Sequence, residues 1–575
     1  MFDKKTLPLI ILLAILVLFY FQIMEFLGFY KPPTRAPQRE QPVTADSIIT
    51  APNTTAGWVG LDTLSATAPP AVTPPLGSAT DSLPTDTVRI MTNKFEVVLV
   101  STGGGVTSLI LPDYTYRDGQ PIQLLPDAQA PVPEVSFAGG TLPTSQMRFK
   151  SNLGPGRYDA TSSPVELTFT YGESGQGEIV RKYRFYPDKY HFDLIVELRD
   201  PAKLGLDRMY KLAWNSPLGV TEPQPETDYQ SMEAVAMMAG SRVKLDEFQN
   251  DRLDQSLNGN PSWAGVRSKY FAAVLIPKNR IAEGAFAQGE RRKVVTAEGR
   301  IEERRLTAGL DMPFASAGIL SDTFAVFVGP LDYTLMAQYK VGLQDMLDIG
   351  TTPFVGWIIK SFALAVIWLL PKMYSVIANY GVVIILFALL VKLVTLPLSL
   401  KSFKSMSAMK ALQPKIEELK IKHKKNPQSM NAEVMKLYKA HGVNPFSGCL
   451  PILLQMPLFF ALFSVFRSTI LLRDAPFVWF IDDLSRGAAS LTDPYIILVV
   501  LMIVTQYFSQ QFTMASTTQQ NKILMYVFPL FMGFLLYKFP AGLVLYWTCF
   551  SVFSLLDYFL YKRGPKVSVA AVSKQ

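Results

Sequence analysis

The chain has 575 residues, which is room for more than one domain, and its hydrophobic fraction of 49% favours a membrane protein. Its formal charge of +8 is modest for this length and matters only where it clusters. Its two cysteines, Cys449 and Cys549, lie in or beside apolar segments near the C-terminus, which excludes a disulfide framework elsewhere and a structural zinc site. The three histidines are dispersed along the chain and support neither a metal cluster nor a His-based triad.

The first apolar segment runs from Leu7 to about Gly28, follows Lys4 and Lys5, and lacks the small-residue cleavage site of a signal peptide. We therefore expect residues 1–30 to form an uncleaved transmembrane anchor with a cytoplasmic N-terminus. Residues 31–87 are rich in Pro, Thr, Ala and Ser and hold few large apolar residues, which predicts a disordered linker.

Residues 88–345 consist of short β-like runs separated by turn residues, which predicts an exported all-β sandwich domain. In the run 190–197 apolar and polar residues mostly alternate, which is the period of a half-buried strand. Gly103, Gly104 and Gly105 stand at a strand end. No helix or lysine follows them as a phosphate site requires, so a turn is predicted there.

Apolar segments return at Phe354. The run up to about residue 374 precedes the next apolar run too closely for both to span, so we expect residues 346–379 to form an interfacial amphipathic helix. Five spans are expected at residues 380–400, 450–466, 495–512, 523–537 and 543–560, with a tight turn at residues 540–542. With the anchor they predict six transmembrane helices, of which five form a core over residues 380–563.

The segment 401–449 is strongly basic, and residues 401–441 of it read as two helices interrupted at Asn426 and Pro427. The predicted topology places this hairpin in the cytoplasm, in agreement with the positive-inside rule, and also the short basic tail 564–575. Its basic face suits anionic lipids at least as well as a specific partner such as ribosomal RNA. The lysines considered for this face are Lys404, Lys410, Lys415, Lys420 and Lys422.

Lys392 lies within the predicted span 380–400, where an ammonium group costs several kcal/mol unless it meets water or a partner. The alternative is that it snorkels to the cytoplasmic interface. Asp557, near the inner end of the last span, is a candidate partner or an interfacial residue. The other spans add uncharged polar side chains that bond between helices or line a hydrated groove with Lys392: Gln455, Thr505, Gln506 and Trp547.

The sequence contains no G-x-S-x-G, no G-x-x-x-x-G-K-[ST] and no H-E-x-x-H, so we expect neither an enzyme nor a bound cofactor. Other motifs occur in a fixed order: Leu412-Gln-Pro-Lys415, the run NPFSGCLPILLQMP from Asn444 to Pro457, Ala475-Pro-Phe477 with Asp493-Pro-Tyr495, and Phe539-Pro-Ala-Gly-Leu-Val-Leu-Tyr546. Together these motifs resemble the YidC family of bacterial membrane protein insertases over residues 340–563. The β-rich segment is similar to the extra periplasmic domain of the family's Gram-negative members.

The resemblance implies five core spans around a hydrophilic groove that is open to the cytoplasm and to lipid. It assigns the groove charge to Lys392, where the family usually has arginine, so the charge is kept without the planar fork of donors. It places Trp547 and Gln506 at groove positions, and Ala388 where some members have threonine.

The expected location is the Gram-negative inner membrane, with both termini cytoplasmic and the large domain periplasmic. The expected partners are nascent inner-membrane proteins, the Sec translocon, the ribosome or targeting factors, and anionic lipids. Two other functions remain open from the residues alone: a small-molecule membrane transporter, and an envelope-assembly protein that acts through its exported sandwich.

Overall fold

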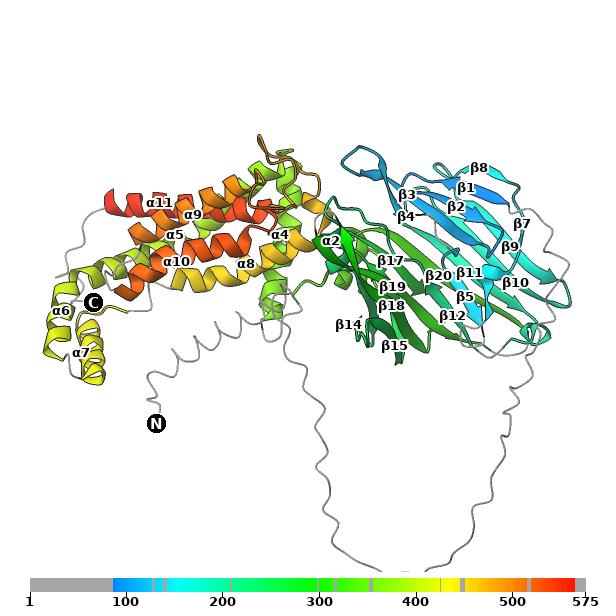
Figure 1. Cartoon of the computed structure of the whole chain (residues 1–575), viewed down its shortest axis with the longest axis horizontal. Helices are drawn as coiled ribbons and strands as arrows, with labels where there is room; N and C mark the ends of the chain where they lie inside the picture. Colours follow the sequence, from blue (N-terminus) through cyan, green and yellow to red (C-terminus); the bar gives the residue numbers. More distant parts are fainter. Residues whose placement is uncertain are drawn as a thin grey trace, which may run out of the picture. The chain divides into compact units, whose positions relative to one another are not determined.

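The computed structural model describes residues 86–126, 130–137, 142–206, 209–296, 299–314, 318–350, 355–423, 426–444, 450–513 and 519–563. The predicted anchor 1–30, the predicted linker up to residue 85 and the tail 564–575 lie outside these residues. The described residues form a β-rich domain up to residue 350 and a helical region from residue 355 (Figure 1).

The β-rich domain is built from three sheets, which confirms the predicted β-rich character of residues 88–345. The five-stranded sheet has the order β4 (Pro121–Leu125), β3 (Gly105–Thr115), β2 (Glu96–Val100), β1 (Thr87–Met91) and β8 (Gly156–Asp159). The six-stranded sheet has the order β15 (Arg252–Asn258), β18 (Gly284–Thr296), β19 (Gly299–Pro313), β12 (Met209–Trp214), β5 (Glu134–Phe137) and β6 (Leu142–Pro143).

The third sheet has nine strands. Its order is β14 (Ser241–Leu245), β13 (Glu233–Met238), β16 (Pro261–Arg267), β17 (Phe271–Pro277), β20 (Ile319–Pro330), β11 (His191–Arg199), β10 (Gly177–Phe185), β9 (Val165–Glu173) and β7 (Lys150–Ser151). Phe185 and Phe192 of this sheet meet Phe95, which directly precedes β2 of the five-stranded sheet, edge-on or tilted, and all three are fully buried. Such aromatic clusters bury much apolar area and stabilise the packing of sheet on sheet.

Strand β11 differs from the half-buried strand that its alternating pattern predicted. It pairs with β10 and β20 in the interior of the sheet, and both of its faces are covered. Its polar residues are buried because partners satisfy them: Asp193 accepts from Tyr186 and pairs with Lys278, and Glu197 pairs with Lys182. Apolar and polar residues therefore alternate along β11 as predicted, but the side chains on both faces of the strand are buried.

The glycines 103–105 form a turn between β2 and β3, as predicted. Gly103 and Gly104 have φ values of +77° and +57°, which an L side chain rarely adopts. Their carbonyl oxygens accept hydrogen bonds from the buried side chains of Arg181 and Tyr183, respectively. The turn thus supports the core.

A helix stands at each of the predicted spans from residue 380 on. The helices of this region are α4 (Gly356–Tyr374), α5 (Tyr380–Ala411), α6 (Gln413–Lys422), α7 (Pro427–Ala440), α8 (Leu450–Ser468), α9 (Ile496–Thr513), α10 (Gln519–Leu536) and α11 (Ala541–Arg563). Helix α11 packs against α5 and α9, α10 packs against α9, and α4 packs against α8 (Figure 1).

Among the described residues, three helices are long and apolar enough to cross a membrane: α4, α5 and the Ala541–Phe559 part of α11. The apolar stretches Ile496–Phe512 and Tyr526–Leu536 are shorter. These helices establish a helical membrane region, but the count of six spans is not confirmed by them. Helix α4, which the sequence predicted to lie in the interface, meets the length and composition of a span.

Helix α5 is longer than the predicted span 380–400. Asn379 caps it by accepting a hydrogen bond from the amide of Val382, and the helix continues for 32 residues to Ala411. Two of the lysines assigned to the hairpin, Lys404 and Lys410, therefore lie on this extension. The sequence signal was misleading because polarity rises at Lys401 although the helix does not end there.

Beyond α5 the chain forms the predicted helical pair, now limited to α6 and α7. Leu412, Ile416 and Val443 make its small buried core, with Val434 and Leu437 packed against them. Asn426 caps α7 by accepting a hydrogen bond from the amide of Ser429, at the break that the Asn-Pro pair predicted.

Candidate functional site

Lys392 lies within α5 and its side chain is only 7% exposed. Its Nζ lies 2.8 Å from Oδ2 of Asp557 and donates a hydrogen bond of 2.9 Å to Oγ of Ser554. The same nitrogen stands 4.7 Å from the centre of the Phe550 ring, within the range of a cation–π interaction. In this state Lys392 is therefore buried and paired. It does not snorkel.

All three partners of Lys392 come from α11. Phe550, Ser554 and Asp557 follow one another at intervals of four and three residues, so they lie on one face of that helix. The hydroxyl of Ser554 donates to the carbonyl oxygen of Phe550, which leaves its lone pairs to accept from the ammonium. The sequence indicated Asp557 as a candidate partner, but Ser554 and Phe550 were missed, although their spacing from Asp557 was a usable signal.

The other predicted groove residues lie at a different level of α11. Gln455 of α8 donates to the hydroxyl of Tyr546, and Trp547 packs edge-on against Phe459 with ring centres 5.0 Å apart. Residues 547 and 557 are ten positions apart, or about 15 Å along a helix. The predicted set is thus divided into a Lys392 level and a Gln455 level along the same helix.

Helix α9 contributes the remaining two residues of the predicted groove. Thr505 donates its hydroxyl proton to the carbonyl of Met502 within its own helix, so it does not bond to a neighbouring helix through that proton. Gln506 is buried, and its side-chain carbonyl oxygen has no hydrogen-bond partner within the described part of the chain. A buried acceptor without a donor costs about 1–3 kcal/mol, which makes Gln506 ready to receive one.

The five lysines considered for the basic face are mostly solvated. Lys404, Lys410, Lys415 and Lys422 are exposed, and Lys420 is partly exposed. A further ion pair, between Lys436 and Glu433, is also at the surface. Solvated lysines on two connected helices and on the end of α5 form a diffuse positive field rather than a built site.

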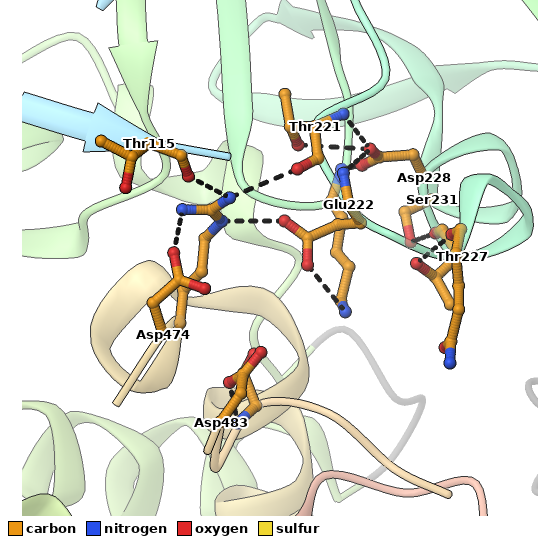
Figure 2. Close-up of polar contacts among 12 residues, drawn as sticks. Thr115, Thr221, Glu222, Thr227, Asp228, Ser231, Asp474 and Asp483 are labelled. Carbon is orange, nitrogen blue, oxygen red and sulfur yellow. Dashed lines mark hydrogen bonds and ion pairs between the residues drawn. The ribbon is translucent and has the colours of Figure 1, made fainter. Parts of the chain in front are cut away.

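A second polar cluster joins the β-rich domain to the segment between α8 and α9. The guanidinium of Arg473 lies 2.8 Å from Oε1 of Glu222 and donates to the carbonyl oxygens of Thr115 and Thr221 (Figure 2). It also pairs with Asp474. Arg473 and Glu222 are almost fully buried. Through these contacts Arg473 bridges three parts of the chain, namely the end of β3, the loop that carries Glu222, and its own segment at Asp474.

The loop that carries Glu222 is itself held in shape. Oδ2 of Asp228, in the short helix α2 (Pro225–Ser231), accepts hydrogen bonds from the amides of Thr221 and Glu222 at 2.6 and 3.0 Å (Figure 2). Burial raises the pKa of Glu222, although Lys269 and Arg473 favour its ionised form. The carboxylate therefore depends on these two cations to remain charged.

Two parts of the chain match known protein families. Residues 87–364 match the YidC periplasmic domain, and residues 372–567 match the 60Kd inner membrane protein family. The membrane protein insertase YidC of Chlorobium phaeovibrioides is 34% identical over 505 residues, which cover 84% of this chain and 85% of that relative.

The membrane protein insertase YidC of Syntrophus aciditrophicus is 30% identical over 580 residues, which cover 98% of this chain and all of that relative. The crystal structure of an active YidC insertase with the first transmembrane domain resolved is 20% identical, and the match covers 83% of this chain and 92% of that one at a TM-score of 0.34. The identity to these two relatives and the two family matches agree with the sequence motifs and with the order of the domains. The chain therefore belongs to the YidC family of membrane protein insertases.

Proposed function

We propose that this chain inserts other proteins into the inner membrane of a Gram-negative bacterium through a polar site centred on Lys392. The observation that carries the proposal is a buried ammonium in the middle of an apolar helix, in a chain that belongs to an insertase family. Charged groups within membrane spans are costly, and they usually mark a pathway for polar groups or ions.

The proposed topology has six spans, namely the N-terminal anchor and helices α5, α8, α9, α10 and α11, with both termini cytoplasmic and the β-rich domain periplasmic. Helix α4 lies in the outer interface in this topology, because a sixth span after the anchor would turn the lysine-rich segment to the periplasm. Its exposed tryptophans support this place: Trp357 and Trp368 are 73% and 61% exposed, and Lys372 lies over the Trp368 ring.

In the proposed mechanism the polar end of a client segment enters between the helices that carry Lys392, Gln506 and Gln455. These groups replace part of the water that the client's polar end loses, which lowers the barrier for its passage. The apolar part of the client then moves into lipid. Each fully buried Leu, Ile or Val contributes about 1.5–3 kcal/mol, so a few such residues offset the roughly 2.5–3.5 kcal/mol of a central charge without ATP.

The basic pair α6–α7 and the end of α5 are proposed to contact the cytoplasmic surroundings of the site. Each exposed lysine near an anionic leaflet contributes about 1 kcal/mol of attraction, which favours anionic lipids as the first partner. The same charges suit ribosomal RNA or a targeting factor, and the Sec translocon is a proposed partner for larger clients.

Complementation tests this function. A Gram-negative strain depleted of its own insertase receives the wild type, Lys392→Arg, Lys392→Ala or Lys392→Glu, and insertion of a small client with an acidic exported end is scored. We expect Arg to retain insertion and Ala and Glu to lose most of it, because only the cation favours an acidic end. Wild-type levels of insertion by Lys392→Ala for every client would show that the charge does not take part.

A further inference from the structure

We propose that Asp557 is the resident counter-ion of the insertion site and determines its selectivity for client charge. A client whose exported end carries carboxylates displaces Asp557 from Lys392, whereas a neutral end cannot. This inference rests on the proposed insertase function and adds to it a residue that sets specificity.

The cation of the site is already neutralised. Lys392 and Asp557 are each 7% exposed, and their charged atoms lie 2.8 Å apart. An arriving carboxylate therefore meets a site with no net charge rather than a free ammonium. Attraction of acidic ends by Lys392, as in the proposed mechanism, requires that Asp557 first move away from the ammonium.

Lys392 and Asp557 are held in place by unequal numbers of contacts. Lys392 keeps two other contacts on α11, the Ser554 hydroxyl at 2.9 Å and the Phe550 ring at 4.7 Å. Among the described residues, Lys392 is the one ionic or hydrogen-bonding partner of the Asp557 carboxylate. When Asp557 turns away, Ser554 and Phe550 hold the ammonium in place, and a client carboxylate finds a receptor that is already formed.

The exchange of counter-ions discriminates between acidic and neutral clients. Removing one member of a buried ion pair leaves an uncompensated charge, which is strongly unfavourable. A client carboxylate takes over the pairing of Lys392 as Asp557 turns away, so the buried ammonium keeps a counter-ion throughout the exchange. A neutral client end offers no such compensation, and Asp557 stays on Lys392.

The test compares two clients that differ only at the exported end, one with aspartates and one with asparagines at the same positions. The full-length chain is reconstituted into liposomes, and insertion is measured by protease protection as the ratio of the aspartate client to the asparagine client. The Asp557→Asn variant should raise this ratio at least about fivefold, the lower end of typical coupling between two ligands of one protein. The double variant Lys392→Met/Asp557→Leu has no charge to satisfy, so whatever insertion remains should show no preference between the two clients.

Size-exclusion chromatography and thermal unfolding in detergent will show whether Asp557→Asn folds. If it does not fold, a second variant still tests the proposal. Ser554→Ala leaves the ion pair intact and removes one holder of the ammonium, so it should lower the ratio by about two- to tenfold, the effect of one hydrogen bond. An unchanged ratio in folded Asp557→Asn, or in Ser554→Ala, overturns the proposal and leaves the pair as a tie between α5 and α11. If the wild type inserts neither client, it is the proposed function that fails.

Discussion

The contact between Arg473 and Glu222 makes the sharpest prediction about how the β-rich domain is connected to the segment between α8 and α9. The Arg473→Ala change removes the cation from Glu222 and from Asp474, and it takes a donor from the carbonyl oxygens of Thr115 and Thr221. These losses fall in a buried cluster, where water replaces the lost partners poorly.

The magnitude follows from burial. Arg473 and Glu222 are 5% and 6% exposed, and breaking such a buried pair costs about 3–5 kcal/mol. Lys269 lies 3.9 Å from the other oxygen of Glu222 and would still compensate part of the carboxylate charge. The expected cost of Arg473→Ala is therefore about 3 kcal/mol, the lower end of this range. At about 1.4 kcal/mol per factor of ten, local opening of the Glu222 loop should become about 100-fold more frequent.

Hydrogen exchange read by mass spectrometry measures this opening in the full chain. The amides of Thr221 and Glu222 donate to Asp228, so their exchange reports on the loop. Arg117→Ala is the matched control, because Arg117 lies 3.6 Å from Asp482 and the two side chains are 39% and 59% exposed. Such a pair contributes less than about 1 kcal/mol, hence less than about a fivefold change. Equal effects of the two substitutions would refute the reasoning.

Three further predictions concern other parts of the fold. Burial lowers the pKa of His191 to about 4, so the folded state holds this ring neutral and loses stability as pH falls from about 6.5 to about 4. The thermal midpoint of the wild type should fall over that pH range, and His191→Gln should make the midpoint depend less on pH. A Cβ on Gly381 would lie 2.0 Å from the Phe477 ring, so Gly381→Ala should lower the thermal midpoint. Adding Phe477→Ala should recover part of this loss, and no recovery would mean that the clash lies elsewhere. Ile416→Ala should destabilise the α6–α7 pair by about 2–4 kcal/mol, seen as faster exchange in α7, and unchanged exchange there would contradict the packing described.

The helices of the membrane region could be predicted because long apolar runs have few alternatives, and Lys392 stood out as a charge within one of them. Its partner could not be fixed in the same way. Helical spacing tells which residues share a face of α11, but it does not tell which neighbouring helix that face meets. The pairing of Lys392 with Asp557 depends on how α5 and α11 pack, and that is a property of the folded chain.

The β-rich domain shows the same limit at longer range. Individual strands were visible as short runs with turn signals, but nothing local showed that β11 would be covered on both faces. Arg473 and Glu222 are separated by 251 residues, and each appeared as an ordinary charged residue in its own segment. The end of α5 was misplaced for a related reason, since a rise in polarity marks a change of surroundings as readily as it marks a helix end.

The length of α5 has a mechanical consequence. One end of the rod is set against Phe477 at Gly381, and the other end passes into the α6–α7 pair at Leu412. Lys392 lies about 17 Å from Gly381 and about 30 Å from Leu412, at 1.5 Å per residue. If the rod pivots near Gly381, a sideways push at the α6–α7 end reaches Lys392 reduced to about 0.4 of its size. A push of about 4 Å there would draw the ammonium about 1.5 Å away from α11, enough to loosen a contact of 2.8 Å. Force applied to the basic pair by a partner would then act as a trigger for the charge exchange deep in the helical region.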